Sequence, residues 1–124
     1  MRILVAGCLK FEGQDCAAII RGGARFIADS LCEEGCIAYR WAVDPIEPDL
    51  IHVFEEWESE RALGRHFQDA SYQAMRAHLE SHRLTGFDVK IYGAQGVEPI
   101  YTEDGQPRAA IFGVPIDAAS LAGE

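Results

Sequence analysis

The order of hydrophobic periodicities along the chain constrains its fold more than any other feature of the sequence. Residues 2–11 are an almost unbroken apolar run of strand length, as expected for a strand that is covered on both faces. Residues 36–43 and 50–57 are two more strand-like segments, and Asp44-Pro45 marks a turn between them. These two segments therefore predict a β-hairpin.

A helical segment lies between the first strand and this hairpin. Its apolar residues recur at helical spacing after an N-cap at Asp15, and Gly35 is expected to end the helix in the left-handed cap position. Gly22 and Gly23 lie in the middle of this helix, where each glycine costs roughly 1 kcal/mol relative to alanine. Close packing against a neighbouring backbone is one explanation for this pair.

The second helical region follows the hairpin in two parts. Ser59 is the expected N-cap of a short helix, and a longer helix follows Ser71 and ends at Gly86. Residues 87–92 alternate between apolar and polar side chains. They predict a fourth strand, with Tyr101 as its furthest extent.

Strand, helix, strand, strand, helix, strand is the order of the split βαβ, ferredoxin-like arrangement. This α+β fold has one antiparallel sheet with its helices on one face. Alternation places one set of residues from 36–43 on a single face: Ile37, Tyr39, Trp41 and Val43. The segment 50–57 divides likewise, with Leu50 and Phe54 on one face and the other apolar residues opposite: Ile51, Val53 and Trp57.

Both faces of the expected sheet therefore carry large apolar side chains, although helices cover only one of them. A bare apolar face of this size needs a partner. A second copy of the same sheet, related by a two-fold axis, is the simplest cover. The sequence therefore predicts a homodimer.

The end of the chain differs from the rest. Residues 1–101 are expected to form the ferredoxin-like domain, and residues 102–124 an extension to it. Within the extension, residues 109–114 are apolar enough to pair as an added strand. The extension is expected either to cover its own subunit or to act as a dimer arm.

Composition narrows the class of partner. The chain has 124 residues, enough for one domain, and 48% of them are hydrophobic, so they can form a core. A net charge of −9 argues against nucleic acid and anionic membrane as the main partners. No apolar run approaches the roughly 18 residues of a membrane span, and the N-terminus lacks the regions of a signal peptide. We therefore expect a soluble cytoplasmic protein.

No metal site is predicted. The four cysteines have no CxxC spacing and are expected to be small buried thiols: Cys8, Cys16, Cys32 and Cys36. Gly35 should place the last two on different elements, which disfavours a metal between them. His78 and His82 have helical i, i+4 spacing, but no third ligand accompanies them, so a solvated helix edge is favoured.

Several motifs are similar to those of the antibiotic biosynthesis monooxygenase family. Residues 34–39 follow its helix-ending E-x-G-C pattern, residues 54–59 contain E-x-W on the third strand, and residues 62–66 read A-L-x-x-H. The match runs over most of residues 1–101. The resemblance implies a dimeric α/β barrel of ferredoxin-like subunits. It also implies oxygenation of electron-rich aromatic substrates, such as quinols, by O2 without a metal, flavin or other cofactor.

Two features depart from the family pattern. Many members carry a second histidine five residues after the position of His66, where this chain has Ser71. The chain also contains no asparagine, so it lacks the catalytic asparagine of some polyketide oxygenases and of related haem-degrading enzymes. Haem degradation is therefore disfavoured.

A cofactor-free oxygenation needs a base that deprotonates a phenol in a dry pocket. His66 is the best candidate, because it shares a helical arc with apolar residues and burial favours its neutral form. The alternative is a core histidine bonded to a backbone carbonyl or a carboxylate.

Other residues are candidates for shaping the site. Glu55 and Trp57 share a strand face, where Glu55 could orient the base or accept a proton and Trp57 could form an aromatic wall. The alternatives are core packing for Trp57 and a pair between Glu55 and Arg40 across the hairpin. Further candidates for substrate binding are Tyr39, Trp41, Tyr72 and His52, the last also a possible second base.

These residues lead to two hypotheses. The first is a homodimeric, cofactor-independent monooxygenase that oxidises a quinol or polyphenol with O2. The alternative is a non-catalytic dimeric barrel that binds a small apolar ligand or acts as an interaction module.

Overall fold

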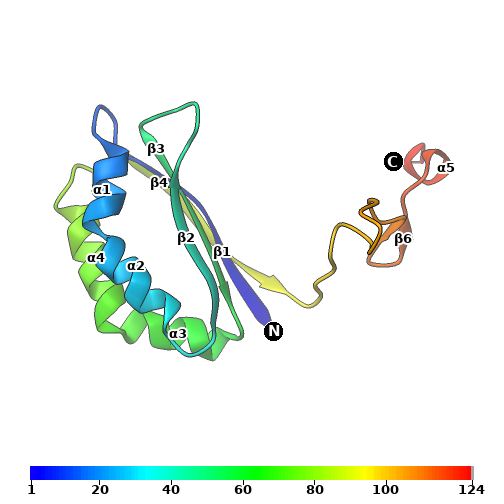
Figure 1. The fold of residues 1–124 in the computed structure, drawn as a ribbon, viewed down its shortest axis with the longest axis horizontal. Helices are drawn as coiled ribbons and strands as arrows, with labels where there is room; N and C mark the ends of the chain where they lie inside the picture. Colours follow the sequence, from blue (N-terminus) through cyan, green and yellow to red (C-terminus); the bar gives the residue numbers. More distant parts are fainter. Residues whose placement is uncertain (124) are drawn as a thin grey trace. The chain divides into compact units, whose positions relative to one another are not determined.

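The predicted α+β, ferredoxin-like arrangement is confirmed by a computed structural model, which describes residues 1–123 (Figure 1). Four strands form one antiparallel sheet in the order β2-β3-β1-β4. Helices α1 to α4 lie on one face of this sheet (Figure 1). The elements are β1 (Arg2–Lys10), α1 (Cys16–Gly22), α2 (Ala24–Leu31), β2 (Cys36–Val43), β3 (Leu50–Trp57), α3 (Glu60–Gln68), α4 (Ala70–Glu80) and β4 (Gly86–Ala94).

Side-chain caps begin three of these helices. Asp15 accepts a hydrogen bond from the Ala18 N–H, and Ser59 accepts one from the Ala62 N–H, so both predicted N-caps are confirmed. The longer helix α4 is capped by Asp69, two residues before Ser71.

The predicted single helix after Asp15 is instead two helices, α1 and α2, separated at Gly23. Side chains of α4 explain the glycine pair. A Cβ atom at Gly22 would lie 2.7 Å from His78 Cε1, and one at Gly23 would lie 2.8 Å from Met75 Cε. The close approach is therefore to side chains of α4, and the expected contact with a neighbouring backbone was wrong.

Ile37 does not share the face of Tyr39 and Trp41 as predicted, because a β-bulge lies at the start of β2. The pairing with β3 shifts register between Cys36 and Ala38, and Ile37 is 44% exposed. Beyond the bulge, Tyr39 and Trp41 share a face as predicted, and this is the face that the helices cover. One extra residue is enough to reverse a face because side chains alternate along a strand.

The core lies between the helices and strands β1, β2 and β3. Its largest fully buried side chains include Trp57, Phe11 and Ile51. The edge strand β4 extends beyond the helices, so its helix-side residues are exposed, and Phe87 is 77% exposed. The opposite face of the sheet carries both apolar and charged side chains. Its apolar residues include Leu4, Phe54 and Tyr92, and its charged residues include the ion pair between Arg2 and Glu56.

A second compact unit begins at Gln95, so the boundary between the two units lies after Ala94. The boundary between domain and extension predicted from the sequence was after Tyr101. Strand β4 ends at Ala94 and does not reach Tyr101, which pairs with Pro107 in an isolated bridge. Residues predicted as an added strand form a small hairpin instead, β5 (Ala110–Ile111) and β6 (Val114–Pro115), followed by α5 (Ala118–Leu121). The last residue of the predicted extension, Glu124, lies outside the described residues.

Positive φ angles at Phe112 and Gly113 form the two-residue turn of this hairpin. Apolar side chains of the second unit are widely exposed: Val97, Ile100, Tyr101, Ile111, Phe112, Val114 and Leu121. None of the helices within residues 1–123 is both long enough and apolar enough to cross a membrane.

Candidate functional site

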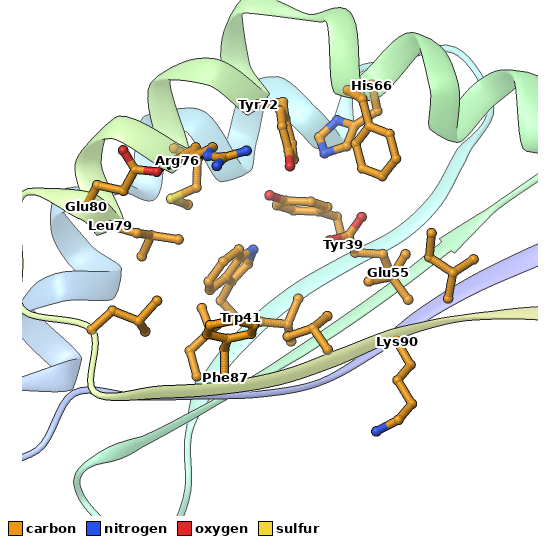
Figure 2. Close-up of a pocket in the computed structure, with 18 residues that line it drawn as sticks. Tyr39, Trp41, Glu55, His66, Tyr72, Arg76, Leu79, Glu80, Phe87 and Lys90 are labelled. Atoms are coloured by element: carbon orange, nitrogen blue, oxygen red, sulfur yellow. Dashed lines mark hydrogen bonds and ion pairs between the residues drawn. The ribbon is translucent and has the colours of Figure 1, made fainter.

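A pocket of about 490 Å³ opens between helices α3 and α4 and the sheet. Most of its wall is apolar, from side chains that include Val5, Leu9, Val53, Met75, Leu79, Leu84, Phe87, Val89 and Ile91. Its polar and aromatic lining residues include Tyr39, Trp41, Glu55, His66, Tyr72 and Arg76. Figure 2 shows His66, Tyr72 and Arg76 projecting from the helices toward the residues on the sheet. A few polar groups in an apolar cavity are typical of a small-molecule site.

His66 lies at the centre of a buried polar network. Its side chain is 1% exposed, and Nδ1 lies 2.8 Å from Glu33 Oε2. The same carboxylate oxygen accepts a hydrogen bond of 3.2 Å from Ser71 Oγ, which in turn lies 3.4 Å from Ser30 Oγ. This network holds one ring nitrogen of His66 in a defined orientation.

Aromatic rings enclose the imidazole of His66. The ring centroid of Trp57 lies 4.6 Å away, that of Tyr72 5.3 Å and that of Tyr39 5.5 Å. His66 lines the pocket and Glu33 does not. Nε2, which has no hydrogen bond to any described residue, is therefore the nitrogen available to a molecule in the pocket.

Glu55 is buried beside this histidine, but its hydrogen bond goes to a different partner. Trp57 Nε1 donates to Glu55 Oε1 at 2.9 Å. Burial raises the pKa of Glu55, although the bond from Trp57 and the nearby His66 partly offset this effect. Arg40 pairs with Phe54 in the strand register and is exposed, so the alternative pair between Glu55 and Arg40 was wrong.

Two hydrogen-bonding groups on the sheet side of the pocket are unusual. Burial and the charge of Glu55 raise the pKa of Tyr39 to about 12, so its phenol remains protonated at neutral pH. Trp41 Nε1 is buried and makes no hydrogen bond of standard geometry to a described residue, although its interaction with the Tyr39 hydroxyl partly offsets the rise in the Tyr39 pKa. An unpaired buried donor costs free energy, so this N–H is a position where a ligand oxygen would be favoured.

The pocket contains one cationic group on its helix side. Arg76 Nε donates to Glu80 Oε1 at 2.9 Å, and both side chains are largely exposed. Glu80 raises the pKa of Arg76, and Tyr72 contributes to this shift. The guanidinium therefore supplies a positive charge beside the Tyr72 phenol.

The structure brings together most of the candidate residues, with two exceptions. Trp57 is fully buried behind His66 and does not line the pocket itself. His52 lies on the opposite face of the sheet, outside the pocket.

His78 is not a solvated edge residue, because its Nε2 forms a hydrogen bond of 2.7 Å with the Ile19 carbonyl.

Glu33 and Arg76 were missed in the sequence analysis. Glu33 immediately precedes the segment 34–39 that was compared with the family and supplies the first residue of E-x-G-C, which is the only signal for it in the sequence. Arg76 follows Tyr72 by one helical turn, but a charge at that spacing is usually solvated. Within residues 1–123, no three His, Cys, Asp or Glu side chains are grouped so that they could hold a metal ion.

Comparison with known proteins shows a similarity to one protein family. A model of the family described as antibiotic biosynthesis monooxygenase matches residues 19–78, which contain Glu33, Glu55, His66 and Tyr72. The central part of the chain is therefore similar to the antibiotic biosynthesis monooxygenase family. No match to this sequence was found among curated proteins.

Solved structures of low sequence identity share the fold. A candidate antibiotic biosynthesis monooxygenase from Deinococcus radiodurans has a TM-score of 0.71 at 18% identity, covering 81% of this chain and 99% of that one. A similar candidate from Nitrosomonas europaea has a TM-score of 0.68 at 14% identity, covering 76% and 90%. A conserved protein from Methanosarcina mazei has a TM-score of 0.67 at 22% identity, covering 74% and 91%.

Proposed function

We propose that this protein is a cofactor-independent monooxygenase that oxidises a quinol or polyphenol with O2, with His66 as the proton acceptor. The observation that carries the proposal is the buried pair of His66 and Glu33 at the wall of an apolar, aromatic pocket. The similarity of residues 19–78 to the antibiotic biosynthesis monooxygenase family supports the class of reaction. We also propose that the protein is a homodimer and that it is located in the cytoplasm.

The proposed reaction begins with transfer of a phenolic proton to His66 Nε2. The carboxylate of Glu33 on Nδ1 stabilises the imidazolium that forms. The resulting phenolate is a far better electron donor to O2 than the phenol. One oxygen atom then replaces a ring hydrogen and the other leaves as water, so that a hydroquinone and O2 give a hydroxyquinone and water.

Three pocket groups support binding of the phenolate. Trp41 Nε1, which makes no hydrogen bond of standard geometry within residues 1–123, can donate to a substrate oxygen. Arg76 lies beside Tyr72 in an exposed ion pair with Glu80, and its guanidinium can favour an anionic intermediate when it exchanges this carboxylate for the substrate. We assign Glu55 to holding Trp57 beneath the base, in place of the base-orienting role expected from the sequence, which Glu33 takes.

The test is enzyme-dependent O2 uptake with a panel of hydroquinones, corrected for autoxidation, using metal-stripped protein. His66→Gln should lower kcat by at least about 100-fold, the usual contribution of a general base. Glu33→Gln keeps a hydrogen-bond acceptor but loses the charge, so it should lower kcat more than it changes KM. His82→Gln is the matched control, because His82 lies outside the pocket.

Unchanged turnover in His66→Gln would remove His66 as the base while leaving the activity in place. An absence of uptake across the panel would favour the second candidate, a non-catalytic ligand-binding protein. The unpaired Trp41 donor in an apolar cavity is the observation that favours this candidate. Binding of a quinol analogue can be measured by the quenching of tryptophan fluorescence. Such binding would distinguish a ligand-binding protein from one whose pocket binds nothing.

A further inference from the structure

A cysteine, a histidine and an aspartate lie in line on the sheet face that the helices leave uncovered. Cys8 of β1 and His52 of β3 are directly opposite in the strand register, and Cys8 Sγ lies 3.3 Å from His52 Nδ1. The other ring nitrogen, Nε2, lies 2.7 Å from Asp44 Oδ1. A nucleophile, a base and an orienting carboxylate therefore lie within hydrogen-bond distance of one another. None of the three lines the pocket described above.

The turn after β2 holds Asp44 in place. Its Oδ2 accepts the backbone N–H of Glu47 at 2.8 Å and that of Ile46 at 2.9 Å. These bonds, together with the one from His52, lower the pKa of Asp44 to about 2, so the carboxylate is ionised at neutral pH. An ionised carboxylate on Nε2 favours the tautomer with its proton there, which leaves Nδ1 free to accept the thiol proton.

We propose that Cys8 is a nucleophilic thiol that forms covalent adducts with neutral α,β-unsaturated carbonyl compounds. Sγ bonds to the β-carbon while the π electrons of the alkene move to the carbonyl oxygen as an enolate. The thiol proton passes to His52 Nδ1 and from there to the enolate. The addition has no leaving group and needs no oxidant or reductant.

The charges around Cys8 select a neutral electrophile. Asp88 of β4 is directly opposite Cys8 in the register, Asp44 lies behind His52, and the whole chain carries a net charge of −9. Lys90 and Asp88 form an ion pair and neutralise each other, so the uncompensated negative charge at this place comes from Asp44 and from the net charge of the chain. An anionic reagent would therefore be repelled, whereas an uncharged one would not.

The other cysteines provide internal comparisons. Cys16 is buried, and burial raises the pKa of Cys36 to about 11, so both thiols are poor nucleophiles at neutral pH. Cys32 is exposed and has no hydrogen-bonded histidine among the described residues. Cys32 is therefore the matched control, because it is more exposed than Cys8 but lacks the base.

The experiment labels the full-length protein with substoichiometric N-ethylmaleimide at pH 7 and maps the modified cysteines by peptide mass spectrometry. Cys8 should react about tenfold faster than Cys32, as expected for a thiol activated by histidine. His52→Gln should lower the rate at Cys8 to that at Cys32 without changing Cys32. Asp44→Asn, which can still accept both turn N–H groups, should lower the rate at Cys8 by a smaller factor.

Two comparisons of labelling rates would overturn the proposal. One is faster labelling at Cys32 than at Cys8, and the other is a rate at Cys8 that does not change in His52→Gln. Cys8 lies near the β2–β3 turn, so the proposal also requires that a second copy on this face leaves Cys8 accessible. Protection of Cys8 at every protein concentration would therefore count against it as well.

Discussion

At the scale of single residues, two carboxylates near His66, one partly buried and one buried, have different partners and different effects. Glu33 bonds the imidazole, whereas Glu55 accepts the indole N–H of Trp57. Burial opposes ionisation of Glu55 and raises its pKa. A buried carboxylate with a raised pKa is a common feature of functional sites and a cost to folding.

Glu55→Gln is expected to stabilise the protein at pH 7. Because the folded-state pKa of Glu55 lies above its ordinary value of 4.5, its contribution to stability is complete below pH 4.5 and is lost as the pH rises through the folded-state value. Glutamine mimics the protonated form and can still accept the bond from Trp57. Urea unfolding of both proteins should show a gap in unfolding free energy that shrinks as the pH falls toward 4.5.

The control for this substitution is Glu56→Gln, on the next residue of β3 and the other sheet face. It removes the partner of Arg2, an ion pair of 2.7 Å, and should not stabilise the protein at pH 7. A Glu55→Gln protein that unfolds more easily than the wild type at pH 7 would show that the ionised carboxylate is stabilising.

At the scale of elements, the turn before β2 brings α2, α3 and the sheet together. Gly35 has a φ of +85°, and a Cβ atom there would lie 2.5 Å from Ala62 Cβ on α3. Its carbonyl also accepts the Glu58 N–H at 2.8 Å. The preceding residues include Glu33, so this turn sets the distance between Glu33 and His66 on α3.

Gly35→Ala should destabilise the protein by about 2 kcal/mol or more, because it adds both a left-handed strain and a steric clash. Gly64→Ala is the matched control: Gly64 lies within α3 with no atom near its Cβ position, so alanine should stabilise by roughly 0.5–1 kcal/mol. Urea unfolding at pH 7 measures both. Equal stability of the two variants would contradict this account of the turn.

At the scale of the whole molecule, the exposed apolar residues of the sheet fall into two groups. Phe54 and Tyr92 lie on the face without helices, among charged side chains. Phe87, Val89 and Ile91 lie on the helix side of β4, beyond the helices. The homodimer predicted from the sequence uses the first group.

Phe54→Asp should therefore convert the dimer to a monomer, and Phe87→Asp should leave it intact. Sedimentation equilibrium at micromolar concentration measures the mass of each, with a wild type of twice the chain mass as the reference. Dissociation by Phe87→Asp alone would move the interface to β4, and a monomeric wild type would contradict the dimer.

The sequence by itself determined the order of elements, the two predicted N-caps and the identity of His66 as a buried histidine, because these depend on local periodicity and local hydrogen bonds. The predicted helix ends at Gly35 and Gly86 were wrong, since the helices end at Leu31 and Glu80. The sequence did not reveal that Glu33 bonds His66 or that Cys8, His52 and Asp44 lie in line. Those contacts join residues far apart in the chain. They depend on strand register, a bulge and the approach of two helices, which only the packed tertiary structure decides.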